Sequence, residues 1–96
     1  MLHISEADHN VTVTISGKFD FRLIKDFQRV LERVPRTWII DLSEVNYVDS
    51  SGLGMLLLLR EKVNGDADRV LLRGLRGQPR DVFVMAKFDR MFKLVP

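Results

Sequence analysis

The sequence has no cysteine among its 96 residues, and this absence excludes several kinds of chemistry. Without thiols there is no disulfide framework, no thiolate zinc site and no cysteine nucleophile. A reducing cytoplasm is the compartment that best fits such a composition. A long apolar run is missing too, since the uninterrupted run Met55–Leu59 falls far short of the roughly 20 residues of a transmembrane helix. The N-terminal residues also lack the basic segment and apolar core of a targeting signal, so we expect no membrane insertion.

What is present indicates one ordered domain. Hydrophobic residues make up 46% of the chain and charged residues 29%, with a mean hydropathy of -0.02. This balance is typical of a globular protein with an apolar interior and a polar surface. A length of 96 residues suits one small domain and leaves no room for a second core. We therefore predict a single domain over residues 1–96, and we expect it to be monomeric.

Hydrophobic periodicity predicts the element order ββαβαβαβ. Alternating stretches on either side of the turn at 8–10 predict a β-hairpin, and the three- and four-residue spacing from Leu23 to Val34 predicts an amphipathic helix closed by Pro35. The apolar run at 37–42 predicts a short central strand covered on both faces. The later elements are expected as a helix from Ser51 to about Asn64, a strand within 69–74, a helix within 78–88 and an edge strand within 91–95.

The alternation of strands and helices implies right-handed crossovers and a mostly parallel sheet, to which the first hairpin adds an antiparallel strand. The predicted fold class is therefore α/β, a small mixed β-sheet with an N-terminal hairpin and interleaved helices. In the second helix we expect Leu53, Leu56 and Leu57 to share one face, while Met55, Leu58 and Leu59 spread apolar surface around it. Such a helix is either deeply buried or partly reserved for a partner.

The tetrapeptide Asp49–Gly52, DSSG, stands directly before this leucine-rich helix. Asp and Ser side chains at a helix start accept hydrogen bonds from unpaired backbone amides, so capping alone can explain Ser50 and Ser51. Gly52 adds a functional alternative, because a glycine allows close approach to the backbone and leaves the preceding hydroxyl uncovered. A phosphate on that hydroxyl would meet the positive end of the helix dipole.

Three segments carry a family resemblance that covers nearly the whole chain. They are IIDLSEVNYVDSSGLGMLLLLRE at 39–61, GKFD at 17–20 and MAKFDRMFKLV at 85–95. Together they resemble the STAS domain family, in particular the bacterial anti-sigma factor antagonists. The resemblance implies the STAS-like fold, and it implies that Ser51, immediately before the glycine, is phosphorylated by a partner that is both anti-sigma factor and kinase. It also implies partner contacts at Asp20, an exposed turn aspartate and helix cap.

The same resemblance implies a partner-binding surface around the serine, formed by Asp49, Ser50, Gly52 and Leu53. The expected function is that of an anti-sigma factor antagonist. Its unphosphorylated form would bind the anti-sigma factor kinase and release a sigma factor, phosphorylation would end the binding, and a phosphatase would restore it. The alternative is a non-switching STAS subunit with a structural role in a transporter or a stress-signalling assembly.

Enzyme, metal, cofactor and nucleic-acid functions are not expected. No histidine lies near Ser51 in the sequence to act as a base, and no Gly-x-Ser-x-Gly elbow, P-loop or dinucleotide motif is present. His3 and His9 are too sparsely surrounded by other ligands for a metal site and are predicted to be solvated. The basic stretch Arg69–Arg80 contains no acid, but the formal charge is only +2 and no aromatics are interleaved with its arginines. It is either a solvated rim or a surface for an acidic protein partner.

Overall fold

The computed structural model describes all 96 residues and confirms the predicted order ββαβαβαβ. The strands are β1 (Leu2–Ala7), β2 (Asn10–Phe19), β3 (Thr37–Val48), β4 (Val70–Arg73) and β5 (Lys93–Val95). The helices are α1 (Ile24–Leu31), α2 (Ser50–Lys62) and α3 (Gly77–Met85), and three short 3₁₀ turns are η1 (Phe21–Leu23), η2 (Ala67–Arg69) and η3 (Phe88–Arg90).

The five strands form one mixed sheet in the order β1-β2-β3-β4-β5. β1 and β2 are antiparallel, and every other neighbouring pair is parallel, which confirms the predicted α/β fold class. The hairpin turns at Asp8 and His9, which both have positive φ values of 52° and 67°. Two consecutive residues of this kind form the tight turn whose twist matches that of paired strands.

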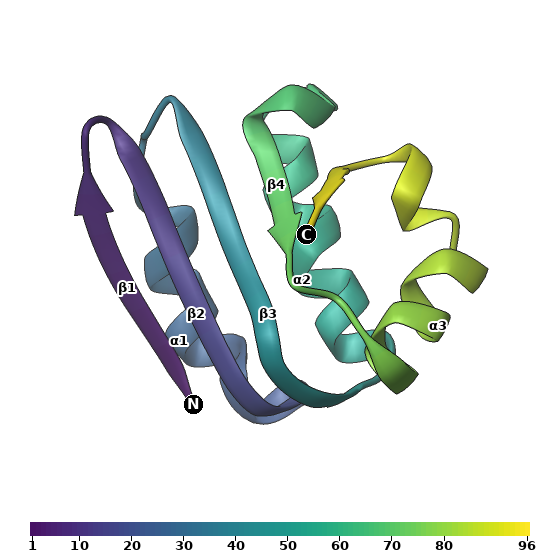
Figure 1. Cartoon of the computed structure of the whole chain (residues 1–96). Coiled ribbons are helices and arrows are strands. Elements are labelled where there is room, and N and C mark those ends of the chain that lie inside the picture. The colour runs from purple at the N-terminus through teal and green to yellow at the C-terminus, as the bar shows by residue number, and fades with distance from the viewer.

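Only one face of the sheet is covered by helices. Figure 1 shows α1 and α2 behind the sheet, whereas α3 lies next to β3. Along β3, Trp38, Ile40 and Leu42 are buried, whereas Ile39 and Asp41 on the opposite face are partly exposed. The expectation that this strand is covered on both faces is therefore wrong. The physical reason is topological, because right-handed crossovers between consecutive neighbouring strands place their helices on the same side.

The first helix is shorter than its apolar spacing predicts. α1 ends at Leu31, and Val34 is 85% exposed although the pattern placed it in the buried stripe. Ile24 belongs to the same stripe and is also exposed. The chain leaves the helix before the buried Pro35, and the N–H of Arg36 donates to the carbonyl of His9 at 2.8 Å. Proline disfavours the helical conformation of the residue before it, which explains why the chain turns back to the sheet here.

The long helix α2 lies close to its predicted bounds and is buried on only part of its surface. Gly52, Met55, Leu56 and Leu59 are buried, whereas Leu57 is 39% and Leu58 51% exposed. Of the three leucines that share one helix face at this spacing, Leu56 is buried, Leu53 is partly buried and Leu57 is exposed, so α2 is not deeply buried on all sides. Two leucines on α2 remain uncovered within this chain. None of the helices has both the length and the apolar character needed to cross a bilayer.

The hydrophobic core is one cluster of 22 residues between the sheet and the helices. Its largest side chains include Trp38, Phe19 and Phe27. A second group of aromatics ties α3 to the C-terminal segment, because Phe88 packs on Phe83 with ring centroids 5.3 Å apart and on Phe92 at 5.1 Å. Burial of such side chains provides most of the driving force for folding.

Candidate functional site

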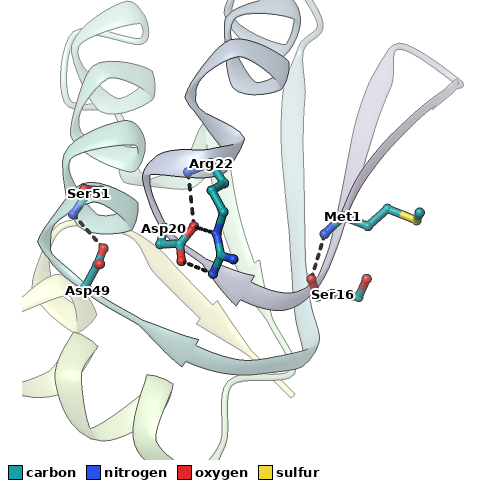
Figure 2. A network of polar contacts seen from close by, with 6 residues as sticks. All are labelled: Met1, Ser16, Asp20, Arg22, Asp49 and Ser51. Carbon is teal, nitrogen blue, oxygen red and sulfur yellow. Dashed lines mark hydrogen bonds and ion pairs between the residues drawn. The ribbon is translucent and has the colours of Figure 1, made fainter.

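Two strand-to-helix turns lie next to each other at the carboxyl ends of β2 and β3. Phe19 and Val48 are partners in the parallel ladder, and the next residue on each strand is an aspartate. Asp20 and Asp49 share an extended backbone, with φ and ψ of -140° and -168° for the first and -128° and -170° for the second. Each aspartate accepts a hydrogen bond from the backbone N–H two residues later (Figure 2). The ladder therefore brings two capped turns together that are 29 positions apart in sequence.

The turn after β2 is closed by an internal ion pair. The Asp20 carboxylate accepts from Arg22 Nε at 3.1 Å and from one terminal nitrogen of its guanidinium at 2.7 Å. These hydrogen bonds hold the pKa of the Asp20 carboxyl below its ordinary value, although burial acts in the opposite direction. Asp20 is only 5% exposed, so the expectation of an exposed turn aspartate is wrong. The exposed charged group of this turn is the Arg22 guanidinium.

The turn after β3 leaves both serine hydroxyls unused. Asp49 Oδ1 accepts from the Ser51 N–H at 2.9 Å, so Asp49 is the helix cap. Neither the Ser50 nor the Ser51 hydroxyl makes a hydrogen bond within the chain, which removes capping as the explanation for these two residues. Ser50 is exposed and Ser51 is partly exposed. Both hydroxyls therefore lie at the positive end of α2, where a helix dipole stabilises negative charge.

Packing requires a glycine at position 52, which the sequence did not reveal. A Cβ on this residue would lie 2.6 Å from the carbonyl oxygen of Phe19 and 2.7 Å from Val48 Cγ2, closer than real side chains approach. Gly52 is buried, so it seats the first turn of α2 on the ends of both strands and does not face the solvent. Leu53, the next residue, is partly buried.

Several large apolar side chains are exposed on the two helices next to the site. Phe21 is 64% exposed and Ile24 46% exposed at the start of the first helical segment, and Leu57 and Leu58 are exposed on α2. α1 and α2 lie side by side on the same face of the sheet (Figure 1). Sequence reasoning missed Phe21 and assigned Ile24 to the core. Helical spacing alone predicts an apolar face on the helix but not which residues at the margin of that face are exposed. We call Phe21, Ile24, Leu57 and Leu58 the apolar surface.

The basic stretch Arg69–Arg80 is divided by the fold. Arg69 donates to the carbonyls of Pro35 and Arg36, and Arg73 pairs with Asp41 at 2.9 Å. Arg76 and Arg80 are exposed and form no ion pair. The four arginines therefore do not form one continuous patch, and only those at the start of α3 are free to meet a partner.

Another contact that sequence reasoning missed joins α3 to the turn after β3. Gln78 Oε1 accepts from the Val48 N–H at 3.1 Å, and Gln78 Nε2 donates to the Val48 carbonyl at 3.2 Å. The two residues are 30 positions apart, so no local pattern could have indicated the contact. His3 and His9 are exposed in the hairpin, as predicted.

The fold and site together define a small mixed-sheet module with a free serine at the start of a central helix. The sequence profile described as "Mlab, STAS domain" matches residues 2–96, and the chain belongs to this family of STAS domains. A STAS-domain containing protein of Pseudomonas aeruginosa (strain UCBPP-PA14) is 38% identical over 87 residues, covering 88% of this chain and 86% of that protein.

Solved structures share the fold at lower sequence identity. An anti-sigma factor antagonist from Mycobacterium paratuberculosis superposes with a TM-score of 0.85 at 24% identity, covering 100% of this chain and 85% of that chain. The anti-sigma factor antagonist SpoIIAA in its unphosphorylated form gives a TM-score of 0.76 at 15% identity, covering 100% and 88%. A sulfate transporter family protein from Wolinella succinogenes gives 0.73 at 20% identity, covering 90% and 73%. The fold thus occurs both in anti-sigma factor antagonists and in a transporter family.

Proposed function

We propose that this STAS domain is an anti-sigma factor antagonist whose binding is switched at Ser51. The unphosphorylated chain binds an anti-sigma factor that is also a serine kinase, and this binding releases a sigma factor. Phosphorylation of Ser51 by the bound kinase ends the interaction, and a phosphatase acting on phospho-Ser51 restores it. The chemistry belongs to these partners, and we place the chain with them in the cytoplasm as a monomer.

The proposal rests on the observation that Asp49, and not Ser51, caps α2. Because Asp49 caps α2, the Ser51 hydroxyl is left without a hydrogen-bond partner at the positive end of a 13-residue helix. A phosphate there adds about -1.5 to -2 charges, which the helix N-terminus accommodates. A residue needed only for capping would have its side-chain oxygen engaged.

The apolar surface indicates that the partner is a protein. Phe21 is 64% exposed just before α1, and Leu58 is 51% exposed on α2 about two helical turns after Ser51. Large apolar side chains left exposed on adjacent helices are typical of protein–protein contacts. In this arrangement Ser50, Ser51 and Leu53 contact the partner directly. Asp49 acts mainly through its cap, and the buried Asp20 and Gly52 hold the two turns in place.

Electrostatics gives the direction of the switch. A partner surface that fits a neutral hydroxyl must desolvate a dianion once Ser51 is phosphorylated, at a cost of several kcal/mol. Because each 1.4 kcal/mol changes affinity about tenfold, binding is expected to fall by roughly a hundredfold or more. The fold itself barely changes, since the helix N-terminus stabilises the added charge by about 0.3 to 1 kcal/mol.

A second candidate is a non-switching STAS subunit that is a structural part of a transporter or a stress-signalling assembly. The occurrence of the fold in a sulfate transporter family protein favours it, as do the uncovered Leu57 and Leu58. In that role the apolar surface is buried permanently against a neighbouring subunit, and Ser51 carries no phosphate.

Measuring phosphate on the peptide at 47–60, after purification of the protein from its own cells, separates the two candidates. Phosphate on Ser51 supports the switch, and its complete absence under all growth conditions supports the structural subunit. Phosphate on Ser50 with none on Ser51 would overturn the assignment of the residue. A Ser51→Ala chain from the same cells is the control, because it removes only the proposed acceptor.

A further inference from the structure

The side chain of Gln78 takes the place of a missing strand beside the end of β3. β4 pairs with β3 only from Trp38 to Asp41, so no strand residue pairs with Val48 on that side. Gln78 instead exchanges two hydrogen bonds with the Val48 backbone, one accepted at 3.1 Å and one donated at 3.2 Å. This is the two-bond pattern by which a residue on one antiparallel strand pairs with the residue opposite it, and here one side-chain amide supplies both bonds.

Val48 is the residue through which this contact reaches the serine turn. It is 1% exposed, it pairs with Phe19 on its other side, and its Cγ2 atom lies directly beneath Gly52. Asp49 follows at once and holds the Ser51 N–H. The main-chain position of Val48 therefore sets where α2 begins and how Ser51 is presented.

The other end of the contact lies on an accessible element. Gln78 is the second residue of α3 and is itself exposed, and it follows Gly77, whose φ of 62° favours glycine. The neighbouring Arg76 and Arg80 are exposed and unpaired. The side chain of Gln78 is therefore accessible to a molecule that contacts this turn of α3.

We propose that Gln78 is a positioning residue for Ser51, and that α3 thereby controls how the serine turn is presented to the kinase. The consequence for phosphorylation rests on the proposed switch at Ser51. The positioning itself is a property of this chain alone, and it can be tested without any partner.

The test compares Gln78→Met with Gln28→Met, the same change at the other glutamine of the chain, which is exposed on α1 and makes no side-chain hydrogen bond. Amide hydrogen exchange of the full chain is followed by NMR. In Gln78→Met we expect the Val48 amide to exchange about tenfold faster or more, as for the loss of one or two hydrogen bonds, with faster exchange also at Ser51. Core amides such as Ile40 should be unchanged, which shows that the fold is intact. Unchanged exchange at Val48 and Ser51 would overturn the proposal.

The reverse direction is tested with Ser51→Asp, which places a charge at the serine turn. We expect the side-chain NH₂ resonances of Gln78 to shift, whereas those of Gln28 stay where they are. No shift at Gln78 would contradict the coupling. Neither experiment depends on a kinase, so a failure of the proposed function, seen as absence of phosphate on Ser51 in cells, is distinguishable from a failure of this proposal.

Discussion

Gly52 lies so close to Phe19 that a Cβ atom on the glycine would stand 2.6 Å from the Phe19 carbonyl oxygen. The contact joins the first turn of α2 to the end of β2, a strand that is not its neighbour in sequence. Through it the first turn of α2, capped by Asp49, packs against the strand end that leads into the turn at Asp20.

Gly52→Ala should therefore destabilise the domain, since the methyl group has to displace the helix from two strand ends. We expect a loss of about 1–3 kcal/mol, the usual cost of overpacking, measured by urea unfolding. Gly54→Ala is the matched control, because a Cβ there meets nothing within 4 Å. Alanine at that helical position should stabilise by about 0.5–1 kcal/mol. Equal effects of the two substitutions would show that the Phe19 contact does not set the position of α2.

Because of the ion pair of Asp20 and Arg22, the unfolding free energy of the domain should depend on pH in the acidic range. The Asp20 pKa is lowered from 3.8 in the folded chain, so its contribution is complete above that value and is lost as the pH falls through the lower folded pKa. Asp20→Asn keeps an N-cap but removes the titration, and its stability should therefore change less with pH below about 4. Arg22→Met should have the same effect, because it removes the hydrogen bonds that lower the pKa. Urea unfolding at a series of pH values measures this, and curves parallel to wild type would contradict it.

Ser51→Ala should bind the anti-sigma factor permanently. Ser51→Asp should bind it more weakly, by up to roughly a hundredfold, for the reason given for the phosphate. Ser50→Asp, the control at the neighbouring exposed serine, should weaken binding less. The two aspartate variants should melt close to wild type, because the added charge lies at a helix N-terminus. Ser51→Ala should do so because the Ser51 hydroxyl makes no hydrogen bond within the chain. Calorimetric titration and thermal unfolding provide the measurements. If the amide spectra change throughout the sheet and α1 after phosphorylation, the switch works through a change of fold and not through local electrostatic repulsion of the partner.

The apolar surface should matter for binding and not for stability. Leu58→Gln changes a side chain that is 51% exposed, and we expect binding to the partner to fall at least tenfold with little change in unfolding free energy. Val34→Gln is the control, since Val34 is 85% exposed and lies after α1, away from the serine turn. If both variants bind like wild type, the partner docks elsewhere on the chain.

Local patterns in the sequence determined the order and approximate bounds of the elements. Alternation at Val11, Val13 and Ile15 predicts a strand with one buried face, and the structure confirms all three as buried. The DSSG motif likewise predicts the start of α2, which begins at Ser50. Such features depend on neighbours within a few residues, and that is the range over which hydrophobic periodicity and capping act.

Only the tertiary structure decided which face of each element is covered and which distant residues meet. The burial of Asp20, the seat of Gly52 on Phe19 and the two hydrogen bonds of Gln78 to Val48 all join segments brought together by the sheet. The uncovered face of β3 follows from the common side of the crossovers, which an apolar run at 37–42 cannot reveal. A contact across 30 residues depends on strand order and register, and these are set by the packing of the whole chain.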